Sequence, residues 1–161
     1  MKEEKQTTWR CSEVFNQSGI ALKGYDVVAY FSEGMARKGL SDYEVEYQGL
    51  VWRFSSEANK VAFMTGPSNY LPQFGGYCAF GASQGYKAST KPHVFEVVDG
   101  KLYFNFARYV QKRWRRDMEK KILAAEAKWP ATKSTAMIQA HPIPIWWKYQ
   151  FLKLVGKDLF K

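Results

Sequence analysis

Cys78 is the residue of this 161-residue chain whose type and surroundings could most readily do chemistry. It stands between Gly75-Gly76-Tyr77 and Ala79-Phe80, in a segment rich in glycine and aromatic residues. The glycines would let a backbone or a ligand approach closely, and the thiol could then act as a soft metal ligand or as a nucleophile. A buried cysteine packed as a small apolar group fits the same surroundings and is the commoner fate of a free thiol. Both interpretations stay open here.

Few other side chains could complete a metal site. Cys11, Cys78, His93 and His141 are all the cysteines and histidines in the chain, whereas a closed zinc site needs four such ligands. A copper site needs fewer protein ligands, and Cys78 with His93 and Met64 would offer soft donors. The candidate metal ligands are therefore Cys78 and His93, with copper or zinc as the ion.

A thiol enzyme or redox sensor is an alternative use of Cys78. It would need a base that lowers the pKa of the thiol, and His93 is the nearest candidate. Asp99 is already explained by a predicted turn and Asp26 by a backbone cap, so no acid completes a catalytic set. We therefore favour a non-enzymatic protein.

Aromatic residues around the glycine segment could instead line a pocket for a planar or apolar ligand. The same residues are also typical of an ordinary core. The candidate pocket residues are Tyr25, Asp26, Tyr30, Phe74, Tyr77 and Phe80.

Two hairpins should position these residues. Residues 43–47 and 51–54 alternate apolar and charged side chains around Gln48-Gly49, and residues 94–98 and 101–106 flank Asp99-Gly100. An Asp-Gly pair supplies the positive φ angles of a two-residue hairpin turn. An early strand over 25–31 is predicted from its β-branched and aromatic residues.

Helices should cover this sheet. Ser55 and Ser56 can cap a helix that ends before Gly66-Pro67, and apolar residues at spacings of three and four predict a single helix over 107–129, ended by Pro130. Residues 69–91 contain too many glycines and prolines for one regular element, so a long structured loop is expected.

These elements predict an α+β fold in which a small antiparallel sheet of hairpins packs against helices. The expected segments are an N-terminal arm (1–19), a domain (20–130), a linker (131–142) and a basic amphipathic C-terminal helix (143–161).

The formal charge of +9 favours anionic partners without choosing among them. The basic run 112–116 carries Trp114 on its core-facing side and matches no nucleic-acid-binding motif, so nucleic acid is not expected. The sequence predicts neither a signal peptide nor a membrane-spanning segment. The chain has only two cysteines, so a disulfide framework is not expected, and the cytoplasm is the default location. Whether Cys11 pairs with Cys78 stays open.

The C-terminal segment offers an interaction surface of its own. Trp146, Trp147, Lys148 and Lys153 are residue types that favour a membrane interface. An amphipathic terminal helix also packs on its own domain or on a second copy. Self-association and peripheral attachment to an anionic membrane are both open.

Three blocks in order, Gly24 to Phe31, Trp52 to Ser56 and Tyr70 to Phe80, resemble the YHS domain family, and the resemblance extends over about residues 20–130. It implies a metal-binding module related to small cysteine-rich domains of metal-handling proteins. In those relatives thiols stand near the positions held here by Ser55 and Asn59. We therefore expect a binding module centred on residues 75–78, with action through the C-terminal segment and thiol chemistry at Cys78 as alternatives.

Overall fold

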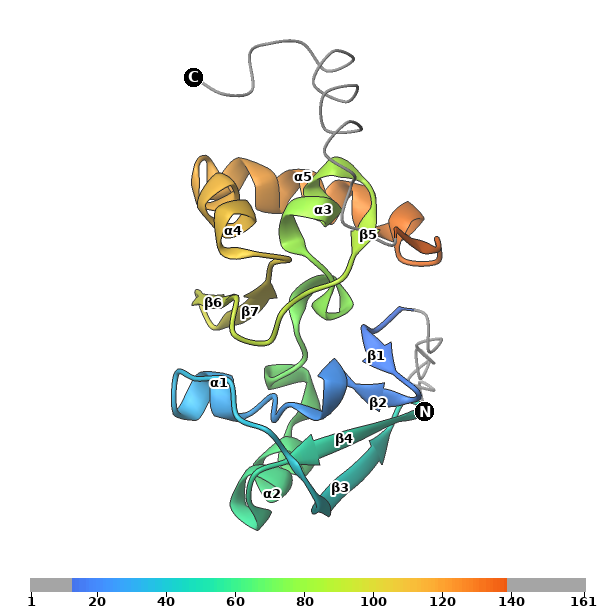
Figure 1. Cartoon of the computed structure of the whole chain (residues 1–161), viewed down its shortest axis with the longest axis vertical. Coiled ribbons are helices and arrows are strands. Elements are labelled where there is room, and N and C mark those ends of the chain that lie inside the picture. Colours follow the sequence, from blue (N-terminus) through green and yellow to red (C-terminus); the bar gives the residue numbers. More distant parts are fainter. Residues whose placement is uncertain (1–12, 139–161) are drawn as a thin grey trace, which may run out of the picture.

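An N-terminal sheet is built around the first hairpin of the computed structural model, which describes residues 13–138 (Figure 1). Strands β3 (Leu40–Tyr47) and β4 (Leu50–Phe54) pair antiparallel, as predicted, and Gln48 and Gly49 both have positive φ at the turn. Strand β2 (Ile20–Ala21) pairs in parallel with β4, and β1 (Asn16–Gln17) completes the order β1-β2-β4-β3.

Helix α2 (Glu57–Thr65) covers this sheet, and its predicted start is confirmed. The Ser56 hydroxyl accepts a hydrogen bond from the backbone amide of Asn59, at 3.2 Å, which caps the first turn. Phe63 is buried on the inner side of α2 and stacks on Trp52 with ring centroids 5.3 Å apart. The helix therefore seals the apolar side of β4.

The predicted strand over 25–31 is wrong. A short helix, α1 (Ala29–Ser32), stands there instead. One oxygen of the Asp26 carboxylate accepts hydrogen bonds from the amides of Val28 and Ala29, at 2.9 and 3.2 Å. An aspartate bound to the amides two and three residues ahead turns the chain into a helix, whatever the β propensity of the following residues.

The second predicted hairpin is confirmed, with β6 (Phe95–Val98), β7 (Lys101–Phe104) and positive φ at Asp99 and Gly100. The expectation that both hairpins share one sheet is wrong, because β6 and β7 form a separate two-stranded sheet. Strand β2 already pairs with the edge of β4 that a second hairpin would need.

Residues 69–91 are more regular than the loop predicted for them. They contain helix α3 (Ala79–Gln84) and strand β5 (Lys87–Ala88), preceded by the 3-10 turns η2 (Pro67–Asn69) and η3 (Gln73–Gly76); another 3-10 turn, η1 (Leu22–Gly24), follows β2. Gly85, with φ of 91°, ends α3 in the left-handed conformation. The glycines in this segment are therefore compatible with short helices, and Gly85 marks the end of one.

The single helix predicted over 107–129 is two helices. Helix α4 (Arg108–Arg115) and helix α5 (Met118–Thr132) are separated by Arg116, which is extended, and by Asp117 at a φ of 55°. Trp114 of α4 and Ala125 of α5 belong to the same apolar cluster although they lie on opposite sides of the break. Pro130 does not end α5, which continues to Thr132, because a proline in the last turn removes only one amide donor.

The core is divided between two halves of the molecule, which we define as the N-terminal half (residues 13–72) and the C-terminal half (73–138). One apolar cluster lies mainly under β4, α1 and α2, and the other joins α3, α4, α5 and η3. Residues assigned above to the arm and linker belong to these halves: Val14 and Phe15 are buried, and β8 (Met137–Ile138) pairs with β5. The α+β class is confirmed, while the C-terminal helix expected over 143–161 lies outside the described residues.

The first prediction concerns the stability of the N-terminal half. The second oxygen of Asp26 accepts hydrogen bonds from the amide and hydroxyl of Ser55 and the amide group of Asn59, at 2.7–2.8 Å. Asp26→Asn would turn an NH2 group toward some of these donors, so we expect the free energy of unfolding to fall by about 3 kcal/mol in urea titrations.

Asp42→Asn is the matched control, because Asp42 lies exposed on β3. We expect it to change the free energy of unfolding by less than about 0.5 kcal/mol. Equal effects of the two substitutions would contradict a special role for Asp26.

Candidate functional site

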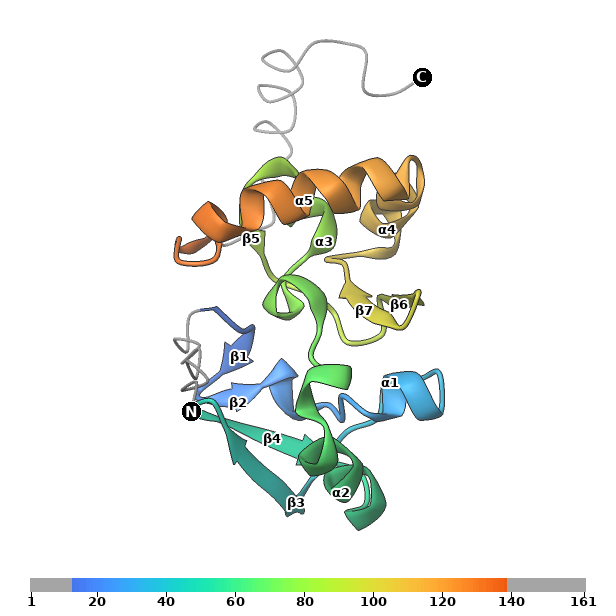
Figure 2. The same ribbon diagram turned by 180° about the vertical axis from the view of Figure 1, so that it is seen from behind.

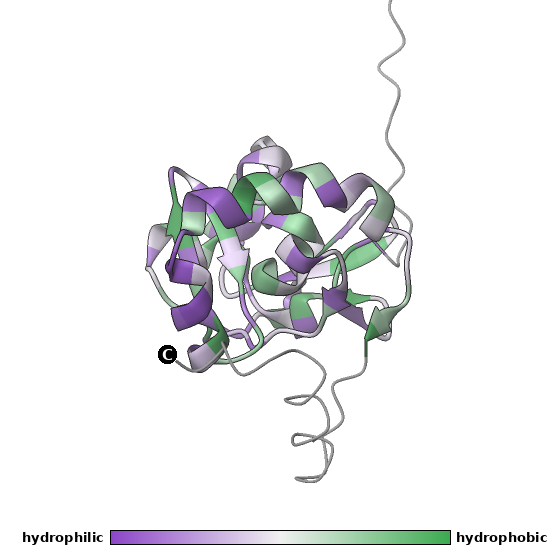
Figure 3. Cartoon of the chain, turned by 90° about the horizontal axis from the view of Figure 1, so that it is seen from above, coloured by the Kyte–Doolittle hydropathy of each residue, from purple (hydrophilic) through white to green (hydrophobic). Residues whose placement is uncertain are grey.

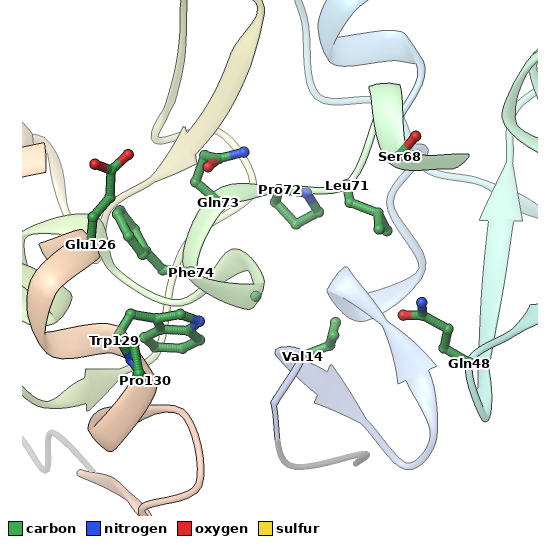
Figure 4. A pocket seen from close by; sticks show the side chains of 11 residues that line it. Val14, Gln48, Ser68, Leu71, Pro72, Gln73, Phe74, Glu126, Trp129 and Pro130 are labelled. Atoms are coloured by element: carbon green, nitrogen blue, oxygen red, sulfur yellow. The ribbon is translucent and has the colours of Figure 1, made fainter. Parts of the chain in front are cut away.

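A cleft of about 340 Å³ lies where the two halves meet. Figure 4 shows Phe74, Trp129 and Pro130 on one side of it, and Val14 and Leu71 on the other. In the reverse view α5, which carries Trp129, lies above β1 and β2 (Figure 2). The remaining lining residues are Gln48, Ser68, Pro72, Gln73, Gly75 and Glu126.

The floor of the cleft depends on a close backbone contact at Gly75. The amide of Phe15 donates a hydrogen bond to the Gly75 carbonyl at 2.8 Å. Gly75 has a φ of 61°, and a Cβ atom there would lie 1.9 Å from the carbonyl oxygen of Glu13. Only glycine allows residues 13–15 to approach η3 this closely, so this contact joins the two walls.

The walls of the cleft are chiefly apolar and aromatic. The rings of Phe74 and Trp129 meet edge to face, with centroids 5.8 Å apart. Gln48, Gln73 and Ser68 supply amide and hydroxyl groups at its edges, and Glu126, whose carboxylate lies 3.8 Å from the Lys101 amine, supplies the one charge. Such a surface suits a small planar or apolar molecule oriented by a few polar contacts.

Cys78 lies away from this cleft lining, at the start of α3, and is 2 % exposed. Its thiol donates to the side-chain oxygen of Asn105 at 3.6 Å, and its backbone amide donates to the carbonyl of Ala88. Asn105 is itself buried and also accepts from the amide of Phe80. Cys78 therefore links α3 to the end of β7.

Burial governs the chemistry of the Cys78 thiol. Loss of solvent raises the pKa of Cys78, and hydrogen bonds from the backbone of Gly81, Phe106 and Phe80 offset only part of that rise. A thiol with a raised pKa holds less of the thiolate that attacks electrophiles or binds metals. The surroundings of Cys78 thus favour the neutral thiol.

His93 does not share this environment. Its side chain is exposed, and its ring lies edge-on to that of Tyr25, with centroids 5.8 Å apart. Met64, the third donor considered for copper, is exposed on α2. Over residues 13–138, no three His, Cys, Asp or Glu side chains gather in a way that could hold a metal ion.

Ser55 and Asn59 have a different use from the thiols expected at these positions in cysteine-rich relatives. Both donate hydrogen bonds to the Asp26 carboxylate. A serine hydroxyl and an asparagine NH2 group that donate hydrogen bonds to a carboxylate form a hydrogen-bond network. They are not a set of soft metal ligands. The described residues therefore do not fit a transition-metal centre.

The predicted pocket residues are dispersed, and of these six only Phe74 lines the cleft. Tyr30 and Tyr77 are core side chains, and Tyr30 donates to the carbonyl of Pro92 at 3.0 Å. The Lys38 amine lies 4.7 Å from the ring centre of Tyr25, and the Arg113 guanidinium lies 5.3 Å from that of Phe80. Asp26 is enclosed by its five hydrogen-bond donors.

Sequence analysis misses most of the cleft. The local pattern places Val14 in an arm, and Trp129 only at the end of a helix. Val14 and Trp129 line opposite sides of the cleft because η3 lies between the two halves. No local sequence pattern indicates this placement of η3. The one available signal is the Trp129-Pro130 pair, since an aromatic residue next to a proline near a helix end offers a rigid apolar surface.

A comparison with known families relates one part of this chain to a described domain. Residues 28–74, which are 47 of the 161 residues, match the model of the YHS domain and are similar to it. The match begins two residues after Asp26 and spans α1, β3, β4 and α2 as far as Phe74, so six of the eleven residues that line the cleft, Leu71 and Phe74 among them, lie within it. Cys78 and His93 follow the matched YHS residues.

Searches of curated proteins and of solved structures gave no match. Among residues 13–138 no helix has the length and apolar character needed to cross a membrane. Cys11, Trp146, Trp147, Lys148 and Lys153 lie outside the described residues.

Gly75→Ala tests the close contact beneath the cleft. Gly100→Ala is its matched control, because Gly100 also has positive φ but a Cβ atom added there would meet nothing within 4 Å. Both substitutions carry the conformational cost of positive φ, and only Gly75→Ala adds a backbone clash. We expect Gly75→Ala to lower the free energy of unfolding by at least about 2 kcal/mol more than Gly100→Ala in urea titrations.

The thiol of Cys78 should react slowly in the native protein. In a Cys11→Ser background, where Cys78 is the one remaining cysteine, we expect alkylation by iodoacetamide at pH 8 to be about 100-fold slower without urea than in urea. Mass spectrometry over time measures both rates. Native alkylation as fast as that of the unfolded chain would contradict the buried, neutral thiol.

Proposed function

We propose that this protein is a non-enzymatic binding module whose ligand is a small, planar, largely apolar molecule held in the cleft between the halves. The observation that carries the proposal is the placement of the Phe74 and Trp129 rings on one wall of a 340 Å³ cleft. That volume falls within the range of small-molecule sites.

The two walls suit a flat ligand. Aromatic rings favour stacked or edge-on contact with another ring, and Val14 and Leu71 face them across the cleft (Figure 4). The side-chain amides of Gln48 and Gln73 can each donate and accept a hydrogen bond at the edge of the ligand. The apolar walls would therefore contact the two faces of the ligand, and hydrogen bonds from the glutamine amides to its edge would orient it.

The chemistry of the lining favours binding over catalysis. None of the lining residues is a cysteine, histidine or lysine, and Glu126 is the single ionisable side chain among them. A nucleophile with an adjacent base, which covalent catalysis requires, is not supplied by this set. Cys78 does not line the cleft.

Metal binding by Cys78 and His93 is the function that the family resemblance implied. It would require ligands beyond the described residues, such as Cys11 or His141, because residues 13–138 form no donor set. We expect elemental mass spectrometry of untagged protein to find the same copper and zinc content in wild type and Cys78→Ala. A stoichiometric metal that is lost in Cys78→Ala would replace the cleft proposal with a metal site.

The cleft itself is tested with indole as the probe. Titration of 15N-labelled protein with indole should shift the amide resonances of residues 71, 73–75 and 126–129, with a Kd on the order of 1 mM for so small a molecule. Leu71→Glu places a charge on the apolar wall and should weaken binding at least tenfold.

Val61→Glu is the matched control, because Val61 is exposed on α2 and does not line the cleft. It should bind indole as the wild type does, and urea titrations check that both variants remain folded. Indole shifts confined to other regions, or equal weakening by the two substitutions, would contradict the proposed site.

A further inference from the structure

The charge of the described chain is concentrated in one half. The C-terminal half carries twelve lysines and arginines against five aspartates and glutamates, whereas the N-terminal half carries five against seven. The helices α3, α4 and α5 form the end of the molecule farthest from the N-terminal sheet (Figure 1). The protein therefore presents a basic end and a mildly acidic end.

Helix α4 holds the densest part of this charge. Five basic residues and no acidic ones stand between positions 108 and 116. Arg115 is paired with Glu96 at 2.8 Å and Arg113 lies over the ring of Phe80. Arg108, Lys112 and Arg116 are exposed, and no acidic side chain of residues 13–138 forms an ion pair with them.

Arg108 and Lys112 lie on the same side of α4, because residues four apart share a helix face, and their positions are about 6 Å apart along the helix axis. Arg116 directly follows the last residue of α4 and is extended. Trp114 and Gln111 face inward and fix the rotation of the helix. The Gln111 amide donates to the carbonyl of Phe95 at 2.8 Å, which ties α4 to the β6–β7 hairpin.

Apolar side chains are exposed in the same half. Tyr109 on α4 is 63 % exposed and Leu123 on α5 is 65 % exposed. Seen from this end, hydrophilic and hydrophobic stretches alternate along the helices (Figure 3). A surface that mixes basic groups with single aromatic and aliphatic side chains suits an interface of charged headgroups and acyl chains.

From these features we infer that the exposed surface formed by Arg108, Tyr109 and Lys112 of α4 and by Arg116, which follows it, binds the surface of an anionic lipid bilayer. The sequence after β8 contains Trp146 and Trp147 with four lysines, residue types that also favour such a surface. The exposed aliphatic side chain of Leu123 favours lipid over nucleic acid, because acyl chains can contact it whereas phosphates cannot.

The test uses the full chain and sedimentation with vesicles. Wild type should bind mixed phosphatidylcholine–phosphatidylserine vesicles, should not bind pure phosphatidylcholine, and should be released by high salt. Arg108→Gln/Lys112→Gln should lower the partition coefficient about 30-fold, since each basic side chain adds about 1 kcal/mol near an anionic surface.

The matched control is Arg37→Gln/Lys60→Gln, which removes two positive charges from the N-terminal half. It should keep wild-type binding within about twofold, because its charges lie away from α4. Equal losses in both variants, unchanged binding by the α4 variant, or no binding by wild type would overturn the inference. So would tighter, α4-dependent binding to a single-stranded oligonucleotide than to the anionic vesicles.

Discussion

The Asp26 carboxylate is the interaction on which the N-terminal half depends. Its two oxygens accept five hydrogen bonds, two from the start of α1 and three from Ser55 and Asn59 at the end of β4 and in α2. A fully buried carboxylate is tolerated only when its oxygens are satisfied. These bonds fix where α1 begins and where α2 leaves the sheet. Ser55 and Asn59 thus serve a structural network here.

The second constraint is steric, and it joins this half to the helical half. Gly75 lets residues 13–15 lie directly on η3, and Gly76 lies beneath the Leu22 side chain, where a Cβ atom would come within 2.6 Å. Beside this contact, the paired rings of Phe74 and Trp129 face Leu71 across a cleft. The fold thereby creates an apolar opening beside a tightly packed joint, which is the basis of the binding function proposed here.

Local chemistry made part of the fold predictable. Both hairpins follow from turn residues that accept positive φ, and α2 follows from its serine cap, all within a few residues of each other. Helix α1 was missed although the Asp26 bonds that start it are local, because the β-branched and aromatic residues after Asp26 favour a strand by propensity. The break at Asp117 leaves the apolar spacing on each side intact, so periodicity cannot reveal it. The cleft was missed because its walls come from segments that are distant in the sequence.

Crystals soaked with 5-bromoindole would test the central claim most directly, because anomalous scattering locates the bromine without assumptions about the ligand pose. The account predicts one bromine peak between the Phe74 and Trp129 rings and the side chain of Leu71. A peak at another place on the molecule, with the cleft left unoccupied under saturating ligand, would contradict it.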